Sequence, residues 1–236
     1  MHLFIYNGTS TRDYGVRISG EDTWVKPSPK MERITVPGRN GDVIRFTGGY
    51  ENVTIPYNCG IIRNFDDVYT GFMNALLSDP GYHRLEDSYH PDIYRMAALT
   101  KIEKPGLHQL NRDGAFTLSF DCRPQSFLKI GETPIEFTAD GTVWNPTPFA
   151  SRPLLRIWGT GSCWIGEEQI TILTADEYTD LDCEEEDAYK DTAAVNCNGN
   201  ITLSTDHFPT IPAGKHLIVL GDGISRIRII PRWWRL

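Results

Sequence analysis

Several acidic residues in the second half of the chain have the spacing of metal ligands. Asp180, Asp182 and Glu184 occupy alternate positions, as the first ligands of a calcium loop do. The sixth position of such a loop must be glycine for a sharp turn, but it is Glu185 here, and the twelfth is Asp191 where a longer glutamate is typical. We therefore favour a solvated acidic loop, with weak calcium binding as the alternative, and expect no metal site.

A second set of residues with catalytic potential is His83, Asp87, His90 and Asp92. Histidine and aspartate can act as metal ligands or as acid and base. Their spacing matches no ligand motif, and a His-Pro-Asp sequence between strand-like runs is also ordinary turn chemistry. We expect no catalytic role for them.

A glycine-containing stretch between the strand-like runs MERITV and VIRF could in principle hold a phosphate. It consists of Val36, Pro37, Gly38, Arg39, Asn40, Gly41 and Asp42. The stretch lacks the lysine and the hydroxyl residue of a phosphate-binding loop, and no helical pattern follows it. Pro-Gly and Asn-Gly are strong chain-reversal signals, so we expect a turn or a loop tip.

Other signatures of enzymes are missing from the sequence. No G-x-S-x-G motif occurs, and no cysteine stands in a recognisable nucleophile context. The five cysteines are far apart and form no C-x-x-C pair, which predicts free thiols packed as small hydrophobic groups: Cys59, Cys122, Cys163, Cys183 and Cys197. We expect a protein without catalytic activity and without a cofactor.

Charge and hydropathy exclude further classes. The formal net charge is −8, with 16 acidic against 8 basic residues in positions 131–236, so the chain lacks the basic footprint of a sequence-specific nucleic-acid binder. No apolar run reaches the length of a membrane span, and the N-terminus has no signal-peptide pattern. We expect a soluble protein made in the cytoplasm that does not insert into membranes.

The sequence predicts mostly β-strands. Alternating apolar residues predict strands over residues 115–123, 52–59 and 224–231, the second of them at an edge or bulged because Pro56 lacks a backbone donor. The run KHLIVLG, residues 215–221, is apolar on both faces and predicts a central strand. A single amphipathic helix is predicted over residues 64–79, capped by Asn64.

A proline-rich stretch between residues 129 and 156 predicts a boundary between two domains, at 1–130 and 131–236. The helix implies an α+β first domain, and short alternating strands imply an all-β sandwich for the second. At the C-terminus, Trp233 and Trp234 follow Pro231 and Arg232. Adjacent residues of a strand face opposite sides, so one tryptophan could anchor the core while the other forms a contact surface.

The ordered set GVRISGEDTW, VPGRNGD, YENVTIPY, GYHRLEDSYHPDIYRMAAL, FDCRPQSFLK and IRIIPRWW resembles the distal tail proteins (Dit) of siphophages, the bacteriophages with long non-contractile tails. This resemblance implies a mainly β fold, with an N-terminal β-sandwich that carries one α-helix and a C-terminal galectin-like β-sandwich. It also implies a homo-hexameric ring, a structural hub of the tail tip or baseplate in the virion, assembled in the host cytoplasm.

The same resemblance implies the partners of that ring. They are the tail tube protein, the tail-tip or tail-associated protein and the tape-measure protein, with a receptor-binding protein as a further one, and DNA would pass through the channel. The stretch from Val36 to Asp42 would lie on an arm that reaches the neighbouring subunit. Two alternatives stay open, a carbohydrate-binding adhesin that uses Trp164, Trp233 or Trp234, and a cell-wall hydrolase.

Overall fold

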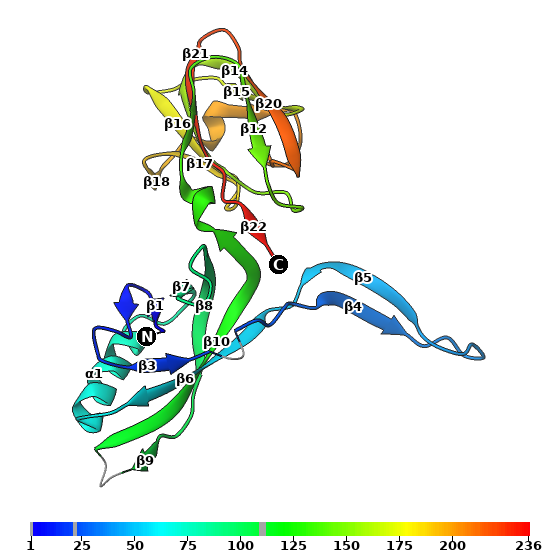
Figure 1. The fold of residues 1–236 in the computed structure, drawn as a ribbon. Coiled ribbons are helices and arrows are strands. Elements are labelled where there is room, and N and C mark those ends of the chain that lie inside the picture. Colours follow the sequence, from blue (N-terminus) through cyan, green and yellow to red (C-terminus); the bar gives the residue numbers. More distant parts are fainter. Residues whose placement is uncertain (1, 21–22, 109–111) are drawn as a thin grey trace. The chain divides into compact units, whose positions relative to one another are not determined.

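A computed structural model describes residues 2–20, 23–108 and 112–236, and it divides into two compact units (Figure 1). The first unit comprises residues 1–126 with Leu236, and the second comprises residues 127–235. Within the described residues the structure is mainly β with one α-helix, which confirms the predicted fold class. No helix in these ranges is long and apolar enough to span a bilayer.

The first unit is built on one large sheet with the strand order β2-β1-β7-β8-β10-β6-β3, in which β9 and β22 (Trp234–Arg235) also pair with β10. The elements of this unit are β1 (Phe4–Tyr6), β2 (Thr9–Ser10), β3 (Arg17–Ser19), β4 (Pro29–Ile34), β5 (Val43–Tyr50), β6 (Val53–Ile61), α1 (Phe65–Leu77), β7 (His83–Asp87), β8 (Ile93–Ile102), β9 (Gly106–His108) and β10 (Asp113–Leu128). The strand β10 continues past the end of the first unit.

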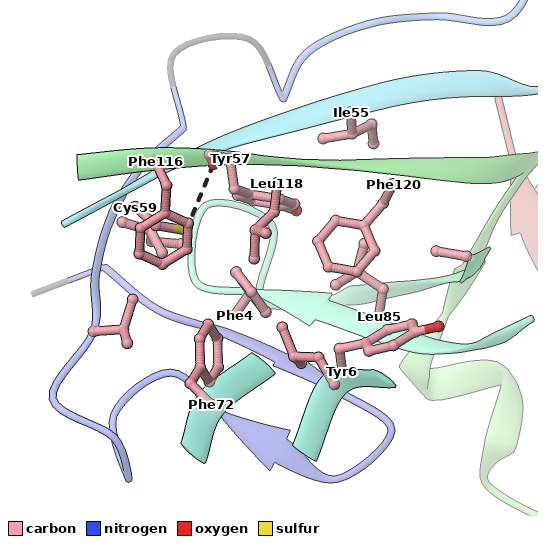
Figure 2. Packing of buried hydrophobic residues seen from close by; sticks show 14 of the residues in the cluster. Phe4, Tyr6, Ile55, Tyr57, Cys59, Phe72, Leu85, Phe116, Leu118 and Phe120 are labelled. Carbon is pink, nitrogen blue, oxygen red and sulfur yellow. Dashed lines mark hydrogen bonds between the residues drawn. The ribbon is translucent and has the colours of Figure 1, made fainter. Parts of the chain in front are cut away.

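The core of the first unit lies inside a sheet that bends over on itself (Figure 2). Three strands separate β1 from β6 in the strand order, yet the ring centroid of Phe4 lies 5.0 Å from that of Tyr57 and 5.4 Å from that of Phe120. Phe72 of α1 packs on the same Phe4 ring. Burial of these aromatic side chains contributes to the stability of this unit, together with the aliphatic residues of the same core.

The helix α1 matches its prediction except at its ends. Phe65, Phe72, Met73 and Leu76 are buried, whereas Leu77 is exposed. Asn64 occupies the N-cap position, but its backbone is left-handed (φ 52°) and its side chain makes no capping hydrogen bond. The expectation that Asn64 caps the helix was therefore wrong in its mechanism, because asparagine serves here as a residue that tolerates positive φ.

The strands predicted in the first unit lie where the alternation placed them. Phe116, Leu118 and Phe120 of β10 are buried. The strand β6 pairs with β10 along its length, but β3 pairs with it only at residues 58–60, so β6 is an edge at Pro56 within the described pairings. This is where a proline costs no ladder hydrogen bond.

The second unit is a sandwich of a six-stranded sheet, β11-β21-β13-β16-β17-β18, and a five-stranded sheet, β12-β20-β14-β15-β19. Its elements are η1 (Lys129–Glu132), β11 (Ile135–Phe137), β12 (Gly141–Asn145), β13 (Leu154–Gly159), β14 (Gly161–Ile165), β15 (Glu168–Ile172), β16 (Tyr178–Asp182), β17 (Asp187–Lys190), β18 (Thr192–Asn196), η2 (Asn198–Asn200), β19 (Ile201–Leu203), β20 (Gly214–Leu220), β21 (Ile224–Ile230) and β22 (Trp234–Arg235). Isoleucine and leucine side chains of both sheets fill the space between them.

Two expectations for this unit need correction. The strand β20 is central, as predicted, but Leu217 is half exposed, so only one of its faces is buried. The acidic stretch is not a solvated loop, because it forms the hairpin of β16 and β17. Asp180 and Asp182 are buried there, and each pairs with an arginine, which offsets the cost of removing a carboxylate from water.

The cysteines are free thiols, as predicted, and Cys59, Cys122, Cys163 and Cys183 are buried. Burial raises the pKa of Cys59, Cys122 and Cys163 to about 12 in each case. Cys197 is half-buried. The four buried thiols therefore serve as small apolar core residues.

Candidate assembly surface: an exposed hairpin arm

The strands β4 and β5 form a two-stranded sheet of their own, which we call the arm. In Figure 1 the arm leaves the large sheet of the first unit as a separate ribbon. Met31 pairs with Phe46, Arg33 with Ile44, and Ile34 with Val43. All six residues of β4 and most of β5 are exposed.

The predicted turn residues form the tip of the arm. Val36 to Asp42 connect β4 to β5, and the carbonyl of Val36 accepts a hydrogen bond from the amide of Arg39 (3.2 Å). Gly38 and Gly41 both have φ near +80°, a conformation that only glycine adopts without strain. The Thr35 hydroxyl donates to the Asp42 carboxylate across the tip (2.9 Å). The structure holds no phosphate-binding geometry at this tip, because no helix follows it.

The surface of the arm is unusually apolar. Phe46 is 65% exposed and Ile44 is 52% exposed, and three further apolar side chains are exposed along the same hairpin: Met31, Ile34 and Val36. Single exposed apolar residues are ordinary, but the register places Met31, Ile44 and Phe46 together on one face of the hairpin, with Ile34 on the other face. Both outer edges of the arm also carry unpaired backbone groups, because the arm has two strands only.

The base of the arm is bent and then anchored. The register of β4 and β5 shifts between Pro29 and Met31, opposite Gly48 and Gly49, which both have positive φ. Beyond this bulge the amide of Glu51 donates to the carbonyl of Ser28 (2.9 Å). Such a bulge changes the direction of a hairpin at a defined point.

Residues that sequence reasoning placed in a possible catalytic set anchor the chain just before the arm. The buried Asp87 carboxylate accepts hydrogen bonds from the Tyr57 hydroxyl (2.7 Å) and from the amides of Tyr89 and His90 (2.9 and 2.8 Å). Burial, then the Asp87 charge, raises the pKa of Tyr57 well above its ordinary value.

His90 continues this network toward the arm. Its Nε2 lies 3.3 Å from the Thr23 hydroxyl, and its ring meets the exposed Trp24 edge to face at 4.4 Å. Burial lowers the pKa of His90. His83 lies apart, with its Nε2 against the carbonyl of Asp79 (2.9 Å). Within the described residues, no three metal-ligating side chains come together here or elsewhere.

The side-chain contacts of the C-terminal candidate residues lie within the second unit, and β22, which begins at Trp234, pairs with β10. Trp233 is buried in its core, and Trp234 stacks on Phe149 with ring centroids 4.4 Å apart and donates from Nε1 to the Ala150 carbonyl (2.9 Å). Pro231 is buried, and Arg232 forms a bidentate pair with Asp182 (2.6 and 2.8 Å). Burial alone would raise the pKa of Asp182, but the Arg232 guanidinium lowers it.

Comparison with known proteins gives no match at the level of sequence families: no family model and no curated protein matches the chain. Its fold, however, is similar to solved structures. The crystal structure of the Dit protein of phage SPP1, described as a paradigm of the hub adsorption apparatus of phages that infect Gram-positive bacteria, superposes with a TM-score of 0.72 at 13% identity, over 100% of both chains. The chain has the Dit fold.

The Dit fold also relates this chain to baseplate structures. Chains of the phage P2 baseplate in its activated conformation, with Ca and with Sr, match with TM-scores of 0.56 and 0.55 at 11% and 12% identity. Each match covers 97% of this chain and nearly all of the other. The exposed arm, an uncommon feature in a monomer, is therefore part of a chain with the Dit fold along its whole length.

Proposed function

We propose that this chain is a structural hub of a siphophage tail tip or baseplate that forms a homo-hexameric ring. In the ring, the arm of one subunit docks on the first unit of the next. The ring joins the tail tube to the tail-tip protein, and the tape-measure protein and then the DNA pass through its channel. A receptor-binding protein is a further candidate partner, and the activity is assembly and not catalysis.

The observation that carries this proposal is the arm. An isolated two-stranded hairpin is marginally stable in water at best, so an arm that stands alone needs a partner surface. Its apolar side chains and unpaired strand edges offer both burial and directional hydrogen bonds to a neighbour. A contact between two different patches on identical subunits closes into a ring when the rotation between subunits divides a full turn.

The charge of the chain supports the same role. A net charge of −8 gives the ring little attraction for the phosphates of DNA, which favours passage over retention. The Dit fold supports it as well, because the similar structures are phage hub and baseplate proteins.

The test replaces apolar residues of the arm and measures the mass in solution. We expect the wild type to scatter light as a multiple of the 26.7 kDa chain, and negative-stain images to show rings with a central hole. Replacing both Ile44 and Phe46 by serine removes roughly 1–2 kcal/mol of burial per residue at each contact, enough to shift the protein to monomers.

The matched control is the replacement of Leu173 and Leu217 by serine, two residues of the second unit with comparable exposure (55% and 52%). This control should leave both the mass and the melting temperature unchanged. A wild type that stays monomeric at high concentration, and also beside its tail-tube and tip partners, would contradict the proposal. Rings that persist in the arm variant would show that the arm is not the contact.

A further inference from the structure

A polar row crosses the outer face of the six-stranded sheet in the second unit. Cross-strand pairing aligns one residue from each strand: Glu136, Arg228, Arg156, Asp180, Tyr189 and Asn196. Neighbouring positions, such as Ile157, Leu181 and Ile229, point into the core and are fully buried. Because strand residues alternate between faces, the whole row lies on the opposite, outer face.

The middle of this row lines a cleft of about 190 Å³. Arg228, Arg156, Asp180 and Tyr189 form the lining together with Asp191, and Leu154 and Ile230 form an apolar wall. The volume corresponds to roughly six water molecules, which is room for one pyranose ring. The cleft is thus a defined hollow on a surface that is otherwise a sheet.

The charges of the cleft are already paired. Arg156 binds Asp180 through Nε and Nη2 (2.6 and 2.8 Å), and Arg228 binds Glu136 through Nε (2.7 Å). A phosphate or carboxylate would have to displace these carboxylates. A neighbouring groove that shares Tyr189 and Asp191 is lined by further acids, including Asp182, Glu185 and Asp187. The electrostatic field therefore disfavours anions.

The cleft still has hydrogen-bonding capacity. In the interactions of the described residues, Nη1 of both arginines, the Tyr189 hydroxyl and Oδ2 of Asp191 take no part. The Tyr178 hydroxyl donates to Oδ1 of Asp191, and Asp180 accepts from the Asp191 amide (3.1 Å), so the Asp191 carboxylate is held in place. Donors and acceptors that stand side by side match a hydroxyl group, which both donates and accepts.

We propose that this cleft is a binding site for a neutral saccharide. One pyranose ring occupies the hollow, its hydroxyls bind Arg156, Arg228, Tyr189 and Asp191, and its C–H face lies on the apolar wall. The site is distinct from the arm and goes beyond the hub function, so either proposal can fail without the other.

The experiment is chemical-shift mapping on the full chain with three neutral probes, lactose, maltotriose and diacetylchitobiose, and one anionic probe, glycerol 3-phosphate. We expect at least one neutral probe to bind saturably with a dissociation constant on the order of 1 mM, and to shift amides of β13, β16, β17 and β21. Tyr189→Phe and Asp191→Asn, which remove one hydroxyl and one charge, should each weaken binding about threefold to tenfold.

Two replacements serve as controls, Asp206→Asn for the charge and Trp144→Ala for an exposed aromatic residue on the five-stranded sheet. Both should bind as the wild type does. The proposal is wrong if no neutral probe binds at tens of millimolar, if glycerol 3-phosphate competes at the same amides, or if the shifts map to the sheet that carries Trp144. If a variant fails to fold, the chemical-shift changes of the wild type alone still test the proposal.

Discussion

Among single residues, Arg232 fixes the C-terminal segment of the second unit. Its guanidinium pairs with the Asp182 carboxylate, and its amide donates to the carbonyl of Gly131 (2.8 Å). Arg232 also has a positive φ of 55°, which a side chain adopts only when its contacts hold it there. The pair thus orders the chain just before Trp233 enters the core.

Replacing Arg232 by methionine leaves Asp182 without its partner. We expect the free energy of unfolding to fall by about 2–4 kcal/mol at neutral pH. Because Arg232 lowers the pKa of Asp182 in the folded state, this stabilisation is present above the ordinary value of 3.8 and is lost as the pH falls below it. The difference in the free energy of unfolding between wild type and variant, measured by urea titration, should therefore become smaller as the pH is lowered. A difference that does not change with pH would contradict this account, and replacement of the exposed Arg12 by methionine is the matched control.

At the scale of an element, α1 begins through backbone geometry and not through a side-chain cap. Asn64 has φ 52° and ψ 51°, a left-handed conformation that glycine tolerates and most other residues do not. The cost of a non-glycine residue there is roughly 1 kcal/mol.

Two substitutions of Asn64 distinguish the effect of its left-handed backbone conformation from that of a side-chain capping hydrogen bond. Asn64→Gly should leave the melting temperature nearly unchanged, whereas Asn64→Ser, although serine is a good cap, should lower stability by about 1 kcal/mol. Thermal unfolding followed by circular dichroism measures both. The reverse order, with serine better tolerated than glycine, would mean that a capping hydrogen bond forms in solution.

Elements with a strong period were predictable, and elements whose form depends on partners far along the chain were not. The alternation of Phe116, Leu118 and Phe120 with polar residues was enough to predict β10. The acidic run predicts a solvated loop, because the arginines that pair with its buried carboxylates, Arg156 and Arg232, lie far from it in the sequence. The row from Glu136 to Asn196 could not be seen in the sequence either, since its residues come from six separate strands.

For the whole molecule, the structure shows two separate cores, one for residues 1–126 and one for residues 127–235. We propose that each unit is an independent domain, as the proline-rich stretch suggested. Calorimetry should then resolve two transitions. Phe72→Ala removes a fully buried ring from the first core and should lower the free energy of unfolding of the first unit by about 3–5 kcal/mol. Arg232→Met should lower the transition temperature of the second unit alone. A single transition shifted by both replacements would refute independence.

Gly48 and Gly49 have left-handed backbone at the bulge near the base of the arm, and a bulge bends a hairpin at a defined point. If the arm is the link between subunits, the bend at this bulge contributes to the rotation between neighbouring copies. A link that turns each copy by a sixth of a circle closes after six, and one that turns it slightly differently closes with another number or winds into an open fibre. The backbone conformation of two adjacent glycines would then influence the number of subunits in the ring.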